Sequence, residues 1–411
     1  MNRKTKWLIA IAVSAVLIVA LGTYVKRSLK PVARLAAVPE DQLLMAQIPG
    51  IPNARYYVAS DLESLVREVV AARRREQAWL AGVGHEGELP PAALLAISGG
   101  GDKGAFGAGL LTGWTAAGTR PVFKAVTGVS TGALIAPFAF LGKDYDQVLQ
   151  EVYTQISPED VARERGMLAA ITQDGMADNR PLWALISKYV NQKLLDAVAV
   201  EHARGRLLLV GTTNLDARQP VVWNMGVIAA SGARNSLDLF RSILLASAAI
   251  PGAFPPSMIR VEADGKPYDE MHVDGGASAQ VFMYPPGLKR AATEIGETMQ
   301  RTASVYVIRN SALAASWDPV ERRTIGIAGR AIDSLIYTQG FGDLFRIYLT
   351  AQRDGLDFNL AYIGPEFVYK GKKKQFETAY MKALYEYGYE QGKAGYPWRK
   401  LPPGLDVPYG E

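Results

Sequence analysis

Residues 122–135 read Val-Phe-Lys-Ala-Val-Thr-Gly-Val-Ser-Thr-Gly-Ala-Leu-Ile, a serine between two glycines flanked by apolar runs. The first run, residues 122–127, predicts a strand, and residues 131–141 predict a helix. A Gly-x-Ser-x-Gly sequence at a strand-to-helix turn is the context of a nucleophile elbow. The flanking Gly128 and Gly132 would allow the turn to pack tightly, with the hydroxyl of Ser130 held at a helix N-terminus. This stretch therefore predicts an α/β fold with a candidate nucleophile.

A second glycine motif lies upstream, after the continuous apolar run of residues 92–97. Such a run is typical of a central parallel strand that is covered on both faces. It is followed by Gly99-Gly100-Gly101-Asp102-Lys103-Gly104 and then by a predicted helix over residues 105–117. Consecutive glycines before a helix N-terminus can direct several amides at one point, where they would bind a phosphate or a developing oxyanion.

Strand and helix patterns alternate along the rest of the chain and predict a three-layer α/β/α sandwich with a mainly parallel central sheet. Before the first strand, Ser60 to Glu63 form a capping box that starts a helix ending near Ala81. Further strands are expected at 207–213, 221–223, 271–273, 304–308 and 358–363, and helices at 144–155, 180–196, 236–249 and 319–352.

An acidic residue, Asp274, ends the short predicted strand 271–273 and is followed by Gly275 and Gly276. Acyl transfer needs a nucleophile, a base within hydrogen-bond reach of it, and donors for the oxyanion. The base must be a carboxylate or one of only three histidines, His85, His202 and His272. The first lies in a loop and the second among charged residues, where exposure is expected. The third lies two residues before the aspartate and remains a possible third member of the site.

The three motifs, in this order, resemble those of the patatin-like phospholipases, which carry Gly-Gly-Gly-x-Lys/Arg-Gly, Gly-x-Ser-x-Gly and Asp-Gly-Gly/Ala. The similarity spans about residues 92–310 and includes Ser247 to Pro256, which resembles a segment that precedes the Asp-Gly-Gly of that family. The resemblance implies a Ser130–Asp274 dyad, with Ser130 as nucleophile and Asp274 as general base. It also implies an oxyanion hole in the glycine loop, at Gly99, Gly100, Gly101, Lys103 and Gly104, with the amides of Gly100 and Gly101 as its donors.

The activity implied by the resemblance is hydrolysis of acyl esters of phospholipids, lysophospholipids or neutral lipids, with no metal or other cofactor. A lipid transacylase using the same acyl-serine is an alternative, and a catalytically silent membrane scaffold is another. A nucleotide-binding module built on the glycine loop is a third. It is disfavoured because Gly118 to Pro121 occupy the zone where a dinucleotide fold places its acidic residue.

The N-terminus carries a membrane signal. A basic start, Asn2 to Lys6, precedes 19 uncharged residues, Trp7 to Val25, which is long enough to span a bilayer as a helix. The segment is expected to be an uncleaved anchor or a cleaved signal peptide, so that the catalytic part is exported or faces the periplasm or exterior. Residues 26–91 then form a linker and helical extension, residues 92–310 the catalytic core, and residues 311–411 helices and a last strand that complete or flank it.

Composition agrees with these expectations. The chain has 411 residues, of which 49% are hydrophobic, enough for a substantial core. It has no cysteine, which excludes disulfides, thiolate metal sites and a Cys nucleophile. The formal net charge of +5 is too small and too scattered to indicate a nucleic-acid partner, but it suits an anionic membrane surface.

Overall fold

The computed structural model describes residues 7, 32–166, 173–297, 300–314, 317, 319–320, 322–371 and 374–405. Apart from Trp7, the predicted N-terminal membrane helix lies outside these residues. Within the ranges just given, no helix combines the length and the apolar character needed to cross a bilayer.

The fold is built on one twisted sheet whose main path runs in the order β1-β7-β6-β3-β2-β10-β11. The five consecutive strands from β6 to β11 are parallel, whereas β1, β7 and the β8–β9 hairpin are antiparallel additions at one side. The predicted α/β architecture with a mainly parallel sheet is thus confirmed. The strands are β1 (Arg55–Tyr56), β2 (Ala92–Ile97), β3 (Phe123–Val129), β6 (Leu207–Asn214), β7 (Gln219–Asn224), β8 (Ser257–Ala263), β9 (Lys266–Asp274), β10 (Ala303–Ala312) and β11 (Asp357–Ile363); β4 (Arg163–Glu164) and β5 (Ala177–Asp178) form a separate pair.

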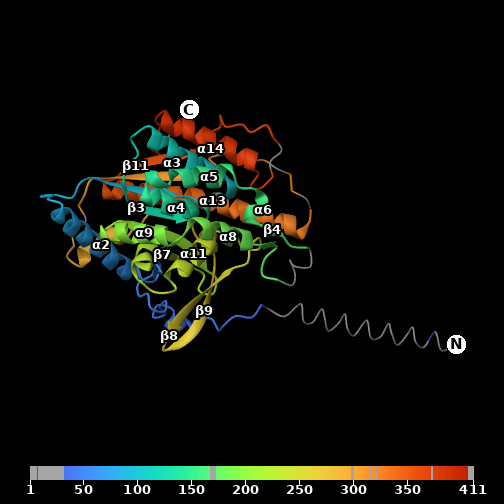
Figure 1. Ribbon diagram of the computed structural model, residues 1–411, viewed down its shortest axis with the longest axis horizontal. Coiled ribbons are helices and arrows are strands. Elements are labelled where there is room, and N and C mark those ends of the chain that lie inside the picture. The colour runs from blue at the N-terminus through green and yellow to red at the C-terminus, as the bar shows by residue number, and fades with distance from the viewer. Residues whose placement is uncertain are drawn as a thin grey trace.

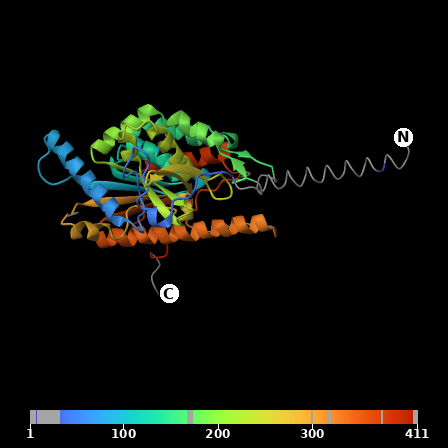
Figure 2. The same cartoon turned by 90° about the horizontal axis from the view of Figure 1, so that it is seen from below.

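Helices cover both faces of the sheet, which Figure 2 shows in side view with the long helix α13 (orange) below it. On one face lie α3 (Gly104–Ala116), α4 (Thr131–Leu141), α9 (Gln192–Ala203), α10 (Met225–Ala230) and α11 (Ser236–Ser247), with α5 (Asp146–Thr154), α8 (Arg180–Tyr189) and α14 (Thr378–Lys393) packed beside or over them (Figure 1). The other face carries α2 (Leu62–Gly82), α12 (Leu288–Glu294) and α13 (Thr324–Asp354). Short elements are η1 (Glu40–Gln42), η2 (Gly101–Lys103), η3 (Lys143–Tyr145), η4 (Gly275–Ala277) and α6 (Pro158–Val161).

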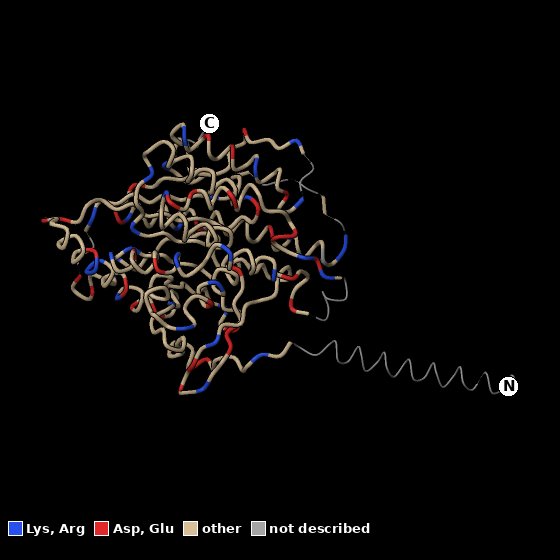
Figure 3. The backbone as a smooth tube through the Cα atoms, viewed as in Figure 1, with Lys and Arg blue, Asp and Glu red and all other residues tan. Residues whose placement is uncertain are grey.

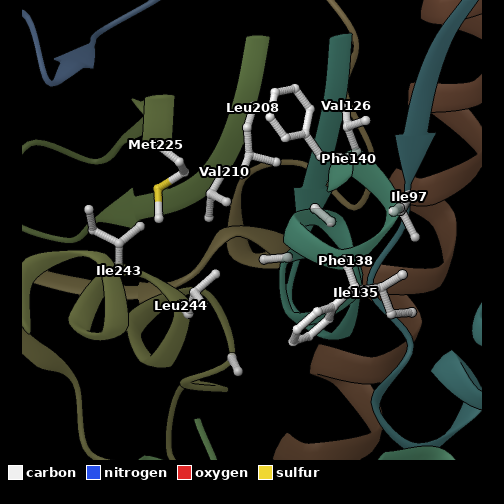
Figure 4. Close-up of a cluster of buried hydrophobic side chains, with 14 of the residues drawn as sticks. Ile97, Val126, Ile135, Phe138, Phe140, Leu208, Val210, Met225, Ile243 and Leu244 are labelled. Carbon is white, nitrogen blue, oxygen red and sulfur yellow. The ribbon is translucent and has the colours of Figure 1, made fainter. Parts of the chain in front are cut away.

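The main core lies between the sheet and the first of these layers. In Figure 4, Leu208 and Val210 of β6 face Ile243 and Leu244 of α11, and all four are fully or almost fully buried. Burying a side chain of this size stabilises the fold by roughly 1.5–3 kcal/mol. Since these strands are apolar on both faces, they read in the sequence as unbroken hydrophobic runs.

Several elements differ from the sequence-based expectation. The predicted capping box at Ser60 is wrong, because Asp61 caps α2 by accepting the amide of Ser64 (3.1 Å). The helix predicted over 180–196 is two helices, because Asn191 leaves the helical conformation and its side chain caps α9 by accepting the amide of Leu194 (3.2 Å). The strand predicted at 271–273 is the end of a nine-residue strand, β9, in a hairpin with the unpredicted β8. Asp264 and Gly265 form the turn with positive φ values of 48° and 69°, which is a recognisable hairpin signal.

Charged residues are spread along the described backbone, with basic and acidic positions interspersed (Figure 3). The segment before α2 wraps the antiparallel side of the sheet. There Gln47 pairs with Glu262 of β8, and Arg55 of β1 forms a buried ion pair with Glu270 of β9. The wrapping segment therefore holds the strand that ends at Asp274.

Candidate active site

Ser130 lies at the sharp turn between β3 and α4, where the sequence predicts it. Its φ of 56° and ψ of −128° are strained for a non-glycine residue, and the side chain is only 8% exposed. A Cβ on Gly128 would lie 2.4 Å from the carbonyl oxygen of Gly132, and one on Gly132 would lie 2.2 Å from that of Ile97. Only glycine fits at both positions, so the two glycines are what allow the strained turn to pack against β2.

The turn is held by Ser247 at the end of α11. The amide of Ser130 donates to the Ser247 hydroxyl (3.0 Å), which in turn donates to the carbonyl of Gly211 on β6 (2.7 Å). The Ser130 amide is therefore already engaged. Sequence reasoning did not assign Ser247 a role, although it lies within the segment 247–256 that carried part of the family resemblance.

Asp274 reaches the serine from the end of β9, which pairs with β6 so that Asp274 lies opposite Thr212. The Ser130 side chain lies beside the Asp274 carboxylate as a hydrogen-bonding neighbour that lowers its pKa, and the amide of Gly276 donates to Oδ1 of Asp274 (2.7 Å). Burial raises the pKa of Asp274 to about 6, although both hydrogen bonds favour the charged form. A carboxylate with this pKa can accept a proton near neutral pH.

The glycines after Asp274 permit close approach. A Cβ on Gly275 would lie 2.5 Å from the carbonyl of Gly211, and one on Gly276 would lie 2.2 Å from the Gln280 amide nitrogen. The carboxylate can therefore sit directly against the elbow because no side chain intervenes.

The glycine loop after β2 borders the same site, and its amides differ in availability. Gly99 donates to the carbonyl of Gln280 (3.0 Å), Lys103 donates to that of Gly100 (3.2 Å), and the amide of Gly104 is used within η2. The amides of Gly100 and Gly101 have no acceptor among the residues that the structure describes. Of the five loop residues predicted for the oxyanion hole, these two are placed to donate to a ligand.

Asn310, at the end of β10, anchors this loop. Its Oδ1 accepts the amide of Gly107 (3.1 Å), and its Nδ2 donates to the carbonyl of Ser98 (2.9 Å). A Cβ on Gly100 would lie 2.3 Å from the Asn310 carbonyl oxygen. Asn310 was not among the residues predicted from the sequence, although a polar side chain at the carboxyl end of a parallel strand was an available signal.

A cavity of about 60 Å³ opens at the serine, and Gly101 and Ser130 contribute to its lining. The rest of the lining is mostly apolar and comes from the helices and loops above the sheet: Leu134, Val152, Ile156, Val161, Leu182, Leu185, Ile250, Phe254, Phe376 and Met381. An apolar cavity beside a nucleophile suits a substrate with a hydrocarbon portion.

None of the three histidines contacts the serine. His272 is fully buried, and its ring nitrogens contact the Thr212 hydroxyl (2.9 Å) and Glu270 (3.1 Å). It is thus part of the polar cluster that holds β9, and its placement does not support a third member of the site. His202 was expected to be exposed, and that was wrong: it packs against Gly226 with 8% exposure, and burial lowers its pKa to about 4.

No group of three or more His, Asp or Glu side chains with the spacing of a metal site occurs in the described part of the chain. The arrangement has the parts that acyl transfer requires: a hydroxyl on a strained turn, a carboxylate beside it, and two unengaged amides at the same cavity.

Among solved structures, the chain resembles VipD from Legionella pneumophila (11% identity, TM-score 0.32), and the similarity covers 74% of this chain and 67% of that one. It also resembles human GIVD cytosolic phospholipase A2 (12% identity, TM-score 0.32), covering 76% of this chain and 55% of that one, so it spans little more than half of that enzyme. For the type III effector ExoU the identity is 14%, the TM-score 0.21, and the coverage 74% and 53%.

No curated protein matches the chain. The family model described as Patatin-like phospholipase matches residues 95–284, which include the glycine loop, the serine elbow and the Asp-Gly-Gly segment. Residues 95–284 of this chain are therefore a patatin-like phospholipase domain.

Proposed function

We propose that the protein is a serine lipid acyl hydrolase that cleaves carboxylic esters through Ser130 and Asp274. The observation that carries the proposal is a serine hydroxyl on a strained strand-to-helix turn beside a buried carboxylate, Asp274, whose pKa is raised to about 6. The family match over residues 95–284 supports the substrate class at the level of lipid esters.

The chemistry follows from the positions of these groups. Asp274 accepts the proton of the Ser130 hydroxyl as the oxygen attacks the acyl carbonyl carbon. Negative charge develops on the carbonyl oxygen and is stabilised by the amides of Gly100 and Gly101. The alcohol leaves with the proton that Asp274 returns, and water, deprotonated by the same carboxylate, then releases the fatty acid from the acyl-serine.

A fluorophosphonate probe tests the nucleophile. It should label the full chain but not Ser130→Ala, while Ser278→Ala, a nearby serine outside the dyad, should label like the wild type. If the wild-type chain is not labelled under conditions in which it is folded, the hydrolase proposal is wrong and the silent scaffold is favoured.

Comparing the kcat values of an Asp274 variant and a His272 variant distinguishes a Ser130–Asp274 dyad from a triad that includes His272. Asp274→Asn should remove ester hydrolysis almost completely, whereas His272→Ala should keep most of the kcat of the molecules that remain folded. Equal losses of kcat in the two variants would assign the base to a triad. Product analysis with defined lipids, including an acceptor alcohol, distinguishes hydrolysis from transacylation.

We also propose that the N-terminal apolar segment brings this site to a membrane, as an anchor or as an export signal. The proposal rests on the 19 uncharged residues Trp7 to Val25 after a basic start. N-terminal sequencing of the mature chain, with fractionation of the membranes, tests it: an intact start in the cytosolic fraction would contradict both forms.

A further inference from the structure

Two adjoining cavities lie on the sheet face opposite to the α3–α4 layer. Their volumes are about 180 and 160 Å³, and both are lined by Leu65 of α2, Leu209 of β6, Met283 and Tyr284. None of the residues that line the catalytic cavity lines either of them. Their combined size falls near the lower end of the range for small-molecule sites.

The walls are apolar over most of the length. The larger cavity, between α2 and the sheet, is bounded by side chains such as Val69, Ala125 and Leu207. The smaller one continues toward the carboxyl ends of the strands and is bounded by Val129, Gly211 and Gly275. A hydrocarbon chain entering from the first cavity would therefore end against the residues next to Ser130 and Asp274.

Charge is concentrated in the larger cavity. Its lining includes Arg73, Lys124, Lys289 and Arg301 but only two carboxylates, Glu76 and Asp354, so its net charge is +2. The smaller cavity includes one arginine and one aspartate, Arg346 and Asp343, which form an ion pair at 3.4 Å.

The carboxylates of the larger cavity are already paired. Glu76 accepts from Lys124 (2.7 Å) and Arg301 (2.8 Å), and Asp354 accepts from Arg353 (2.8 Å) and the Tyr284 hydroxyl (2.9 Å).

Two cations at the opening form no ion pair among the residues that the structure describes. Arg73 has no such partner. Lys289 donates to the carbonyl of Asp354 (3.3 Å) and lies near its carboxylate, which is already engaged by Arg353 and Tyr284. Both cations are half-buried, Arg73 on α2 and Lys289 on α12, so they lie where the cavity meets solvent.

We infer that these cavities bind one long-chain fatty acid, with its carboxylate at Arg73 and Lys289 and its chain along the sheet toward Val129 and Gly275. An anionic head is required because the unpaired charge at the opening is positive, and a charge-assisted hydrogen bond is stronger than a neutral one. A single chain is favoured because the two cavities together are too small for a diacyl lipid. The site is separate from the proposed ester hydrolysis and does not depend on it.

The test is a fluorescence titration of the full chain carrying Ser130→Ala with cis-parinaric acid, a fluorescent C18 fatty acid. Saturable binding is expected, and the double variant Arg73→Glu/Lys289→Glu should weaken it by about tenfold or more. The matched control is Arg74→Glu/Arg290→Glu, which changes the charge equally at the neighbouring, 71% and 84% exposed side chains and should leave binding unchanged.

A second measurement keeps the inference testable if the double variant fails to fold. Oleic acid should displace the probe about tenfold better than oleyl alcohol, because only the acid carries the negative charge. Equal displacement by the two, or equal binding by the test and control variants, would overturn the inference. So would loss of binding on Leu134→Trp, which fills the catalytic cavity instead. Since Ser130→Ala is used throughout, failure of the proposed hydrolysis leaves this test intact.

Discussion

At the scale of single residues, the site depends on a carboxylate that the fold makes less acidic. Asp274 is 5% exposed, and no cation in the described part of the chain lies beside it to hold it ionised. Its hydrogen bonds come from a hydroxyl and an amide, which only partly offset the loss of hydration. The same burial that suits Asp274 to the base role proposed for it therefore works against the folded state when Asp274 is ionised.

The first consequence is a pH dependence of catalysis. A general base acts only when deprotonated, so kcat/KM for a water-soluble ester should be level above the Asp274 pKa of about 6. Below that pH it should fall about tenfold per unit. A profile measured between pH 4.5 and 8 checks this, and a midpoint near pH 4 would mean that Asp274 is not desolvated.

The second consequence concerns stability. The folded pKa of Asp274 lies above its ordinary value of 3.8, so folding retains the proton and the folded state loses stability as pH rises from about 4 to 6. Asp274→Asn removes that loss, so at pH 7 its free energy of unfolding should exceed that of the wild type by up to about 3 kcal/mol. The variant should therefore unfold at a higher urea concentration. Urea titrations at pH 7 and pH 4 test this, because the gain should shrink at the lower pH.

At the scale of elements, α3 and α14 cross with their backbones in close contact. A Cβ on Gly109 or Gly113 of α3 would lie 2.0 Å from a carbonyl oxygen of α14, and one on Gly388 or Gly392 of α14 would lie 2.4 Å from one of α3. In each helix the two glycines are four residues apart, so they lie on the same face. That face has no side chain at the crossing, which lets the two backbones approach. This crossing fixes α3, and α3 carries the glycine loop at its N-terminus.

Gly388→Ala should therefore destabilise the protein, because the added methyl group forces the two helices apart at a cost of roughly 1–3 kcal/mol. Gly342→Ala in α13 is the matched control, since its Cβ would meet nothing within 4 Å. It should stabilise the helix by roughly 0.5–1 kcal/mol. Thermal unfolding of both variants compares them, and equal effects would show that the crossing is not tight.

Elements with a strong local pattern were predictable, and those that depend on distant partners were not. The apolar runs of β2 and β3 and the contiguous motifs around Ser130 and Asp274 carry their own signals. Ser247 and Asn310 act through contacts made across the fold, so the local signals around them could mark the two residues but could not say which groups they hold. The hairpin of β8 was missed although its Asp-Gly turn was readable.

At the scale of the whole molecule, the sheet separates two apolar sites. One opens at Ser130 among the helices α4, α5 and α8, and the other lies beneath α2 and α13. Sequence patterns could not reveal the second, because Leu65 and Val69 have the spacing of an ordinary buried helix stripe. The two sites come close to each other at the carboxyl ends of β3 and β9, where Val129 and Gly275 line the second cavity and are the sequence neighbours of Ser130 and Asp274.

Binding of a fatty acid in the second site should stabilise the entire domain, because the cavity exists only when α2, α12 and the sheet are assembled. For a ligand that binds only the folded state, a concentration one hundred times its Kd adds about 2.7 kcal/mol to the free energy of unfolding. Oleic acid should accordingly raise the Tm of Ser130→Ala, with a rise that grows with the logarithm of its concentration. In Arg73→Glu/Lys289→Glu the same concentrations should give a much smaller rise, whereas Arg74→Glu/Arg290→Glu should respond like the parent. An equal rise in all three would place the ligand elsewhere on the protein.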